Sequence, residues 1–315
     1  MLNYIIRRLV SLIPVLLIVG LVVFLILRLI PGDPAAVMLG PEATETQIEA
    51  LRAKMGLDQP LFQQLVNWYA NMFRGDLGES LYYKLPALTV IVQRLEPTLL
   101  LMIMSLIISL LIGLPAGIIA ALKRNTYVDR LLMIFAMLGI STPSFWLGLN
   151  LIMVFSLSLG WFPATGYVPI GEGGLLNAVW YLFLPAFSLG FQYAGEQARV
   201  IRSSMLDVLG SDYVRTARAK GLTEKVVILS HTLRNALIPT LTTIGLCVAR
   251  LAGGAVVTET VFNIPGAGKL VISAINRRDY GLVQAHILLV AMVYVVVNLI
   301  VDLLYKVVDP RIEYR

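Results

Sequence analysis

Residues 98–122 read TLLLMIMSLIISLLIGLPAGIIAAL, 25 consecutive positions without a charged side chain. An α-helix rises about 1.5 Å per residue, so a helix of this length spans a hydrocarbon core about 30 Å thick. Inside a bilayer every backbone polar group needs a partner within the protein, and continuous apolar runs exclude a β-barrel. Five further stretches are also long and predominantly apolar: 9–30, 131–159, 175–198, 237–261 and 282–305. The sequence therefore predicts an all-α polytopic membrane protein with six transmembrane helices.

The composition supports this class of protein. Hydrophobic residues make up 58% of the 315 positions and charged residues 14%, whereas soluble domains carry about 25% charged residues. One cysteine, Cys247, excludes a disulfide within this chain, and His231 and His286 offer too few ligands for a metal site. We therefore expect neither a metal nor a bound cofactor. The net charge of +6 does not indicate nucleic-acid binding, because basic residues of membrane proteins set their orientation.

The placement of lysine and arginine predicts that orientation. With the N-terminus inside, the inner segments 1–8, 123–130, 199–236 and 306–315 carry 15 basic residues. The outer segments carry eight over a greater total length. The positive-inside rule therefore places both termini in the cytoplasm.

Segment 31–97 is the one sizeable outer segment. Residues 44–56 have apolar positions at helical spacing, with Thr46 and Glu49 as a capping box. A second helix is predicted over 60–73, and its apolar stripe is expected to pack on the membrane domain. The segment has too few core positions to fold as an independent domain, so we expect it to form a cap on the membrane domain. The expected organisation is 1–30 (N-terminus and first span), 31–97 (cap) and 98–315 (transmembrane core).

Proline interrupts the third and fourth spans, at Pro143 and Pro185. Because proline removes a backbone donor and clashes with the preceding turn, we expect these helices to kink or break. Broken helices often line transport paths, but proline is also commoner in membrane helices generally. Pro143 is placed on the candidate path.

Residues 207–239 form an inner loop that reads DVLGSDYVRTARAKGLTEKVVILSHTLRNALIP. The loop is polar and basic yet keeps helical periodicity. One face of its second helix is expected to carry Val226, Val227, Leu229 and Leu233. Gly221 separates the two predicted helices, since glycine turns the chain at positive φ without steric cost. We call this helix, glycine turn and helix of residues 207–239 the knob. A knob of this kind suits docking into a groove of another protein. An amphipathic helix held by anionic lipid explains the pattern equally well.

This loop resembles the EAA loop of ATP-binding-cassette (ABC) importer permeases, which contacts the ATP-hydrolysing subunit. TARAKG at 216–221 and RNALIP at 234–239 look like the peptide-importer branch, although Arg215 stands where the general motif has glutamate. The resemblance implies a type I ABC importer permease fold with cytoplasmic coupling helices in 199–236. It also implies an ATPase contact made by Arg215, Thr216, Ala217, Ala219, Lys220, Gly221 and Leu222.

Further motifs extend the resemblance over the whole chain. They look like the first permease subunit of dipeptide, oligopeptide, glutathione or nickel importers: PGDP (31–34), GLDQP (56–60), GDLGES (75–80) and DPR (309–311). Residues 278–281 read RDYG, where that family often has Arg-Asp-Tyr-Pro. The replacement of proline by glycine affects only the expected rigidity of this outer loop. The implied partners are a second homologous permease, two ABC ATPase subunits, an extracytoplasmic substrate-binding protein and the lipid bilayer. The implied location is the inner or plasma membrane of a prokaryote.

The chain lacks the phosphate-binding pattern of an ATPase. Residues 265–269, PGAGK, approach a P-loop, but Asn263 replaces its first glycine and Leu270 its hydroxyl residue. We therefore expect a non-catalytic subunit, with ATP and Mg²⁺ bound by the partner ATPase subunits.

Arg250 is the most unusual charge, because it is the fourteenth of 25 residues in the span 237–261. A guanidinium at this depth is costly unless it is paired or hydrated, and it suits bidentate binding of a carboxylate. Gly253 and Gly254, one turn later, offer close backbone approach. These three residues are placed with Pro143 on a candidate substrate path. An ion pair between Arg250 and an acid of the partner permease is an equal alternative.

Charges near the span ends have plainer interpretations. Arg28 is close enough to the outer end of the first span to snorkel. Glu196 and Arg199 are three residues apart and are expected to form a local ion pair.

Together these features predict a permease subunit of an ATP-driven importer for short peptides, which forms half of the translocation pathway and works by alternating access. Glutathione and nickel are alternative cargoes, since a separate binding protein often fixes specificity. A secondary transporter would need ion-coupling acids near mid-membrane, and Glu259 and Asp302 lie near span ends. An intramembrane enzyme would need a nucleophile, base or metal set that two distant histidines and one cysteine do not supply.

Overall fold

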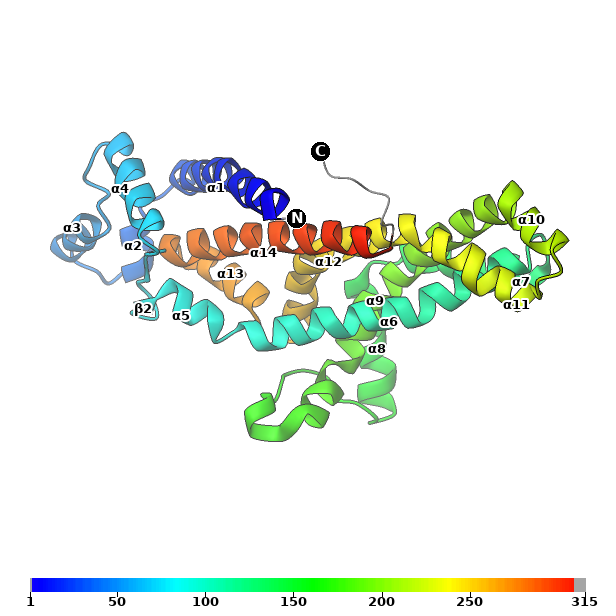
Figure 1. The fold of residues 1–315 in the computed structure, drawn as a ribbon. Helices are drawn as coiled ribbons and strands as arrows, with labels where there is room; N and C mark the ends of the chain where they lie inside the picture. The colour runs from blue at the N-terminus through cyan, green and yellow to red at the C-terminus, as the bar shows by residue number, and fades with distance from the viewer. Residues whose placement is uncertain (1, 309–315) are drawn as a thin grey trace. The chain divides into compact units, whose positions relative to one another are not determined.

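The computed structural model describes residues 2–308, which are mostly helical (Figure 1). The motif at 309–311 lies outside these residues. The described chain divides into two compact units. Unit 1 consists of residues 2–96 and 265–295, and unit 2 consists of 97–264 and 296–308.

Unit 1 combines the first helix, the cap and the segment that leads into the last helix. A small antiparallel sheet pairs Glu79 with Pro86 and Ser80 with Leu85. The elements of this unit are α1 (Leu2–Leu29), α2 (Pro34–Leu39), α3 (Glu45–Lys54), α4 (Leu61–Phe73), β1 (Glu79–Ser80), β2 (Leu85–Pro86), α5 (Ala87–Val92), α13 (Ala267–Asn276) and the first part of α14 (Tyr280–Val308).

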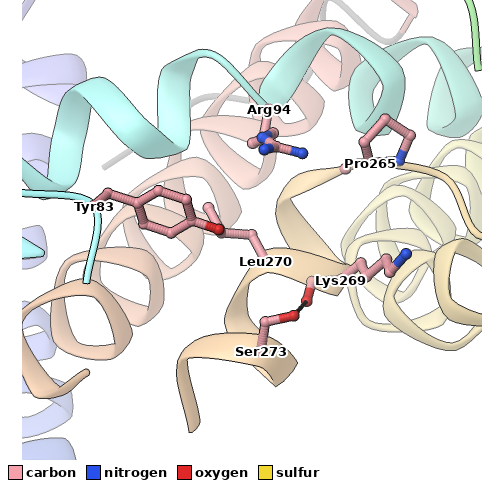
Figure 2. Close-up of a pocket in the computed structure, with 7 residues that line it drawn as sticks. Tyr83, Arg94, Pro265, Lys269, Leu270 and Ser273 are labelled. Carbon is pink, nitrogen blue, oxygen red and sulfur yellow. Dashed lines mark hydrogen bonds between the residues drawn. The ribbon is translucent and has the colours of Figure 1, made fainter. Parts of the chain in front are cut away.

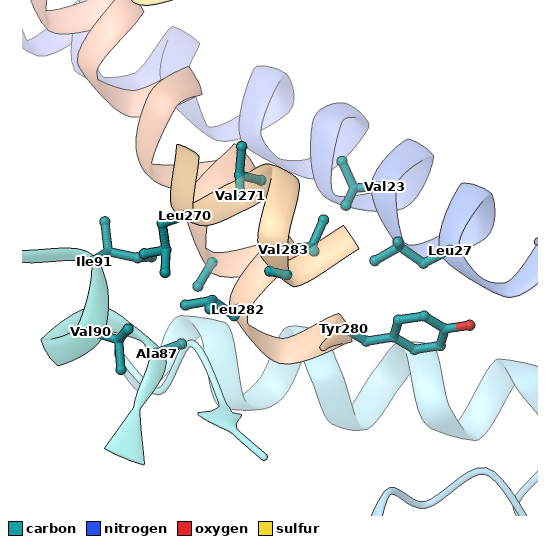
Figure 3. Close-up of a cluster of buried hydrophobic side chains, with 12 residues drawn as sticks. Val23, Leu27, Ala87, Val90, Ile91, Leu270, Val271, Tyr280, Leu282 and Val283 are labelled. Carbon is teal, nitrogen blue, oxygen red and sulfur yellow. The ribbon is translucent and has the colours of Figure 1, made fainter. Parts of the chain in front are cut away.

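The core of unit 1 is made of hydrophobic side chains from four helices (Figure 3). Val23 and Leu27 of α1 are four residues apart, so both lie on one face of that helix. This face meets side chains of α5, α13 and α14: Ala87, Val90, Ile91, Leu270, Val271, Ala274, Tyr280, Leu282, Val283 and Ala285. Burial of this cluster holds the start of the last helix against helices far away in the sequence.

Helix α4 packs on α1, as its apolar stripe predicts. Trp68 lies against Gly20, where an added Cβ atom would be 2.9 Å from the indole ring. The hydroxyl of Tyr69 donates a hydrogen bond of 2.6 Å to the carbonyl of Leu17. Helix α4 is therefore tied to α1 by both apolar and polar contacts.

The capping box of α3 differs from the prediction. Thr44 is the N-cap residue: its hydroxyl accepts the N–H of Gln47, and the Gln47 side chain accepts the N–H of Thr44. The stretch TETQIE contains two overlapping capping-box patterns, and the predicted pair, Thr46 and Glu49, lies inside the helix instead. The helix begins at the earlier pattern, where the first free backbone N–H groups are.

Buried contacts fix the start of α14 to β1. Ser80 Oγ donates to the carboxylate of Asp279, and the N–H of Leu282 donates to the same carboxylate at 3.4 Å. Burial raises the pKa of Asp279 above its usual value, although the bond from Ser80 opposes this shift. A Cβ atom on Gly281 would lie 2.4 Å from the carbonyl oxygen of Glu79. Glycine at 281 thus permits a close approach of the two segments.

Unit 2 holds most of the long apolar helices. Its elements are α6 (Leu95–Leu122, from Pro97 on), α7 (Tyr127–Ser141), α8 (Ser144–Leu151), the π-helical turn η1 (Ile152–Ser158), α9 (Ile170–Leu209), α10 (Asp212–Ala219), α11 (Glu224–Val226), the π-helical turn η2 (Val227–Leu233) and α12 (Arg234–Val261). Helix α9 packs against α7, α8 and α12. It also meets α6 closely, since Cβ atoms on Gly113 and Gly117 would lie 2.7 and 2.5 Å from carbonyl oxygens of Ala194 and Ala198. Small residues of this kind let membrane helices approach.

Pro143 breaks the third predicted span. Helices α7 and α8 meet at an angle of 100°, and Pro143 is the N-cap of α8. Helix α9, in contrast, continues through Pro185 and departs from helical geometry at Gly174, where φ is +77°. The break expected at Pro143 is confirmed, whereas α9 is not broken at Pro185.

Within the residues that the structure describes, four helices are long and apolar enough to cross a membrane: Leu95–Leu122, Ile170–Leu209, Glu224–Val261 and Tyr280–Val297. The broken pair Tyr127–Ser141 and Ser144–Ser158 makes a fifth if it is counted as one span. Helix α1 contributes a shorter apolar stretch, Ile13–Leu29. The prediction of a helical polytopic membrane protein is confirmed at this level.

Candidate functional site

The predicted helix, glycine turn and helix are present between α9 and α12. Helix α10 is followed by Gly221, whose φ is +80°. The N–H of Gly221 donates to the carbonyl of Arg218 at 2.9 Å, and the N–H of Leu222 donates to the carbonyl of Ala217 at 3.4 Å. These two bonds form the Schellman pattern, which ends helices with a residue in the left-handed conformation. The turn therefore depends on Gly221 for its backbone geometry.

Helix α10 has one buried face and one exposed face. Val214 and Ala217 are buried against Val227 of η2, and Val208 of α9 packs beside them. Of the seven predicted contact residues, six are exposed: Arg215, Thr216, Ala219, Lys220, Gly221 and Leu222. Ala217 instead lies inside the knob, where it holds α10 against η2.

Two polar contacts stabilise the knob, and sequence reasoning missed both. Arg218 Nε pairs with Glu224 across the turn at 2.7 Å. Asn235 Nδ2 donates to the hydroxyl of Tyr213 at 3.0 Å, which links α12 to α10. The first contact spans six residues around a turn, so a search for partners one helical turn apart does not find it.

The second helix of the knob continues into a helix that is long and apolar enough to cross a membrane. Elements α11, η2 and α12 form one helical run, Glu224–Val261. Val227 is buried, but Val226 and Leu229 are exposed, so the apolar face expected for this helix is wrong in part. The prediction assumed 3.6 residues per turn, and the wider π-helical turn η2 changes which side chains face inward.

Arg250 of α12 pairs with Glu196 of α9. Its Nη1 atom lies 3.0 Å from both carboxylate oxygens. The side chains remain 55% and 28% exposed in this chain. The local pair expected between Glu196 and Arg199 is replaced by a contact between neighbouring helices. Arg250 thus has an acidic partner within its own chain, 54 residues away in the sequence.

The other candidate path residues lie in different surroundings. Gly254 lets α12 approach α9, because a Cβ atom there would be 2.9 Å from Leu189 Cδ1. Gly253 faces open space: no described atom lies within 4 Å of the corresponding Cβ position. Pro143 is exposed at the break between α7 and α8. Gly254 therefore has the close approach predicted for the pair, and Gly253 does not.

A bidentate ion pair joins α7 to α9. Arg202 Nε and Nη2 lie 2.6 and 2.8 Å from the two carboxylate oxygens of Asp129. Asp129 is only 3% exposed, and its carboxylate also accepts the N–H of Asn125. Sequence reasoning missed this pair, although Asp129 is the single acid in the basic loop 123–130. A single acid among basic residues was the sequence feature that could have indicated this ion pair.

The stretch PGAGK at 265–269 contributes to a small cavity at the start of α13 (Figure 2). Tyr83, Arg94, Lys269 and Ser273 are among its lining residues, and its volume is about 80 Å³. Ligand pockets usually measure about 300–1,000 Å³. This cavity is therefore too small for a nucleotide.

Comparison with known proteins places this geometry in a family. Residues 113–314 match the family described as binding-protein-dependent transport system inner membrane component, and residues 1–89 match the N-terminal part of such components. The probable peptide ABC transporter permease protein y4tP of Sinorhizobium fredii is 45% identical over 99% of both chains. The glutathione transport system permease protein GsiC of Escherichia coli is 46% identical over 100% of both chains.

A solved structure shares the fold. A chain of the inward-facing MetNI methionine ABC transporter superposes with a TM-score of 0.58 at 18% identity, covering 71% of this chain and 98% of that chain. The family match covers well over half of the sequence and agrees with the apolar helices of the structure. This chain therefore belongs to the family of binding-protein-dependent transport system inner membrane components.

Proposed function

We propose that this chain is the permease subunit of an ABC importer for short peptides and forms half of the translocation pathway. The observation that carries the proposal is the full-length identity of 45% and 46% to a probable peptide permease and a glutathione permease. Glutathione is itself a tripeptide, so the second relative favours it as an alternative cargo of the same chemical class.

The proposed topology has six spans: α1, α6, the broken pair of α7 with α8 and η1, α9, α12 and α14. The basic excess of segment 199–236 supports an inner location for that loop and for both termini. A cysteine introduced at Glu45 or Glu172 is expected to react with an impermeant maleimide in intact cells. A cysteine at Lys220 is expected to react only after permeabilisation. Labelling of the cysteine at position 220 in sealed cells would contradict the topology.

The turn between α10 and α11 is the proposed contact with an ATPase subunit. Its exposed face offers a mixture of cationic, hydroxyl and apolar groups from Arg215 to Leu222, while Val214 and Ala217 hold the helix from inside. The helical run Glu224–Val261 begins at this turn. A displacement of the turn is therefore transmitted along one continuous helix to Arg250.

Arg250, Gly253, Gly254 and Pro143 are the proposed path residues. A half-exposed guanidinium facing lipid is heavily disfavoured, which supports a wet path or an interface with the second permease for this face. The Glu196 carboxylate pairs with the Arg250 guanidinium when no cargo is present. A peptide carboxylate therefore has to displace Glu196 to bind Arg250. Cargo held in this way is bound weakly, which suits transit.

In the proposed cycle this chain performs no covalent step. ATP and Mg²⁺ bind to two partner ATPase subunits, and closure of that pair draws together the coupling turns of the two permeases. The helices then open outward to receive cargo from the extracytoplasmic binding protein, and hydrolysis returns them to the inward-facing state.

Transport by the reconstituted complex tests the proposal. Proteoliposomes that contain both permeases and the ATPase subunits, supplied with the binding protein, are expected to accumulate radiolabelled trialanine or glutathione only when ATP is present on the ATPase side. The preferred cargo is read from mutual competition. Accumulation that follows an ion gradient and ignores ATP would refute the proposal and support a secondary transporter.

A further inference from the structure

Unit 1 contains a second, larger cavity that the coupling turn and the candidate path do not use. It lies between the end of α1, the α3–α4 connection, α4, β1 and the start of α14, and its volume is about 480 Å³. This volume falls within the range of about 300–1,000 Å³ that is usual for ligand pockets. In the proposed topology the cavity is on the extracytoplasmic side, where cargo arrives.

Arg28 is a fixed cation in the wall of this cavity. Its Nε donates to Gln64 Oε1 at 2.9 Å, and its Nη1 donates to the carbonyl of Phe24 at 3.3 Å. The guanidinium also lies 3.4 Å from the centre of the Phe24 ring. These contacts hold the charge in place, which reduces the conformational entropy lost when an anion binds. Arg28 is thus anchored by protein contacts beyond what snorkelling requires.

Gln284 supplies a buried donor without a partner. Its side chain lines the cavity and is 4% exposed, and its Nε2 atom has no hydrogen-bond partner among the described residues. Gln64, which is buried in the same wall, differs because its Nε2 donates to the carbonyl of Gln59 at 2.8 Å. A buried amide without a partner is costly, so such a group in a cavity wall points to an absent acceptor.

We propose that this cavity binds a short peptide through its C-terminal carboxylate, with Arg28 and Gln284 Nε2 as donors. The inference rests on the proposed peptide-import function and adds a receiving site for the cargo in the cap unit. Glu79 also lines the cavity and offers an opposite charge for the free amino end of the peptide. The wall further carries the carboxamide of Asn71 for the main chain of the peptide, beside those of Gln59 and Asn67, in which Asn67 Nδ2 donates to Gln59 Oε1 at 3.1 Å.

The lining favours a peptide over a phospholipid headgroup. The phosphodiester of a headgroup offers only acceptor oxygens, so any donor to the Glu79 carboxylate has to come from the terminal ammonium or hydroxyl group of the headgroup. A peptide main chain alternates donors and acceptors, so it satisfies both kinds of group in the wall. Trp68 and Tyr280 add apolar surface that suits small side chains.

Peptide binding to the assembled transporter without its binding protein tests this site. The probes are radiolabelled trialanine and its C-terminal amide, measured by equilibrium dialysis with the complex in nanodiscs. Trialanine is expected to bind saturably, and the amide about tenfold or more weakly, as for loss of one hydrogen-bonded charge.

Three substitutions assign the binding to the cavity. Gln284→Leu removes the donor and is expected to weaken trialanine binding about tenfold, with thermal stability retained because an unpartnered amide is lost. Gln284→Glu keeps the shape and repels the carboxylate, so it weakens binding further and provides a second variant if leucine disturbs folding. Gln63→Leu is the matched control: Gln63 is exposed on α4, lies outside the cavity lining, and is expected to leave binding unchanged.

The outcomes separate this inference from the proposed function. If the complex imports peptide normally but trialanine does not bind, or binds to both Gln284 variants as tightly as to the parent, the cavity is not a peptide site and the proposed function stands. If the complex does not import peptide at all, the proposed function fails. If native mass spectrometry instead finds a phospholipid that the parent retains and Gln284→Leu loses, the cavity is a lipid site and the inference is overturned.

Discussion

Substitution of Gly221 tests the coupling turn through its backbone geometry alone. With φ at +80°, residue 221 lies in the left-handed region, and no described atom is within 4 Å of the position of an added Cβ. A side chain there meets no steric obstacle, so its cost is conformational. That cost is about 1–2 kcal/mol for alanine. For valine it is nearer the top of the range of about 1–3 kcal/mol for strained backbone positions, because β-branched residues are poorest in this region.

These energies predict a graded series. Gly221→Asn is expected to be mild, since asparagine is enriched several-fold in the left-handed region. Gly221→Ala is expected to reduce the population of the native turn by a factor of about 5–30, and Gly221→Val by more. The two Schellman bonds from Gly221 and Leu222 are lost when the turn opens. Membrane insertion is expected to persist, because no long apolar helix includes this residue.

The assay measures co-purification of the ATPase subunits and cargo-stimulated ATP hydrolysis in proteoliposomes. Gly210 provides a matched control in the same loop, because its φ is −79° and a Cβ there would have only ordinary contacts, the nearest at 3.5 Å. Gly210→Val is expected to behave nearly as the parent. If Gly221→Val co-purifies its ATPase and hydrolyses ATP as well as Gly210→Val does, the reasoning that this turn docks is refuted.

Three further predictions follow from named contacts. Ala217→Asp places a charge in the buried contact with η2 and is expected to open α10 to limited proteolysis, whereas Thr216→Asp, on the exposed face, is expected to weaken ATPase co-purification while α10 stays protected. Arg250→Ala is expected to lower uptake of trialanine more than uptake of its C-terminal amide. If Arg250→Ala instead lowers uptake of both peptides equally and destabilises the complex, and if exchanging Glu196 and Arg250 restores stability, the pair is only structural. Asp279 has a raised pKa in the folded chain, so the folded state binds the extra proton and stability falls as pH rises from about 3.8 to that raised pKa. Asp279→Asn is expected to flatten this fall in thermal stability, and an unchanged slope would show that Asp279 does not cause it.

The features that could be predicted from the sequence are those in which a single residue type or a local period decides the outcome. Length and apolar character indicated the membrane helices, because a spanning helix is specified within its own segment. Gly221 indicated a turn because few other residues adopt positive φ without cost. Pro143 indicated a break because proline removes a backbone donor and clashes with the preceding turn. In the structure it follows the extended Thr142 and is the N-cap of α8.

The features that could not be predicted depend on contacts between distant segments or on small shifts of helical register. Glu196 meets Arg250 only because α9 and α12 pack together, while the nearer Arg199 offered a plausible local partner. Gly281 acts through the backbone of Glu79, about 200 residues earlier in the chain. The π-helical turn η2 lacks a clear sequence signal, and it determines that Val227 is buried while its neighbour Val226 is exposed.

The Glu196–Arg250 pair also limits what the proposed path can do. Both side chains are charged on helices that are long enough to span the membrane, and neither is fully buried in this chain, so lipid contact would cost several kcal/mol. Pairing makes the site neutral overall, and it therefore exerts little long-range attraction on an anion. A carboxylate gains from Arg250 only at close range, when it displaces Glu196, and Glu196 takes its place again when the cargo leaves. Selection of cargo at a distance must then be the task of other parts of the transporter, which is consistent with a separate binding protein and with a receiving cavity that includes the fixed cation Arg28.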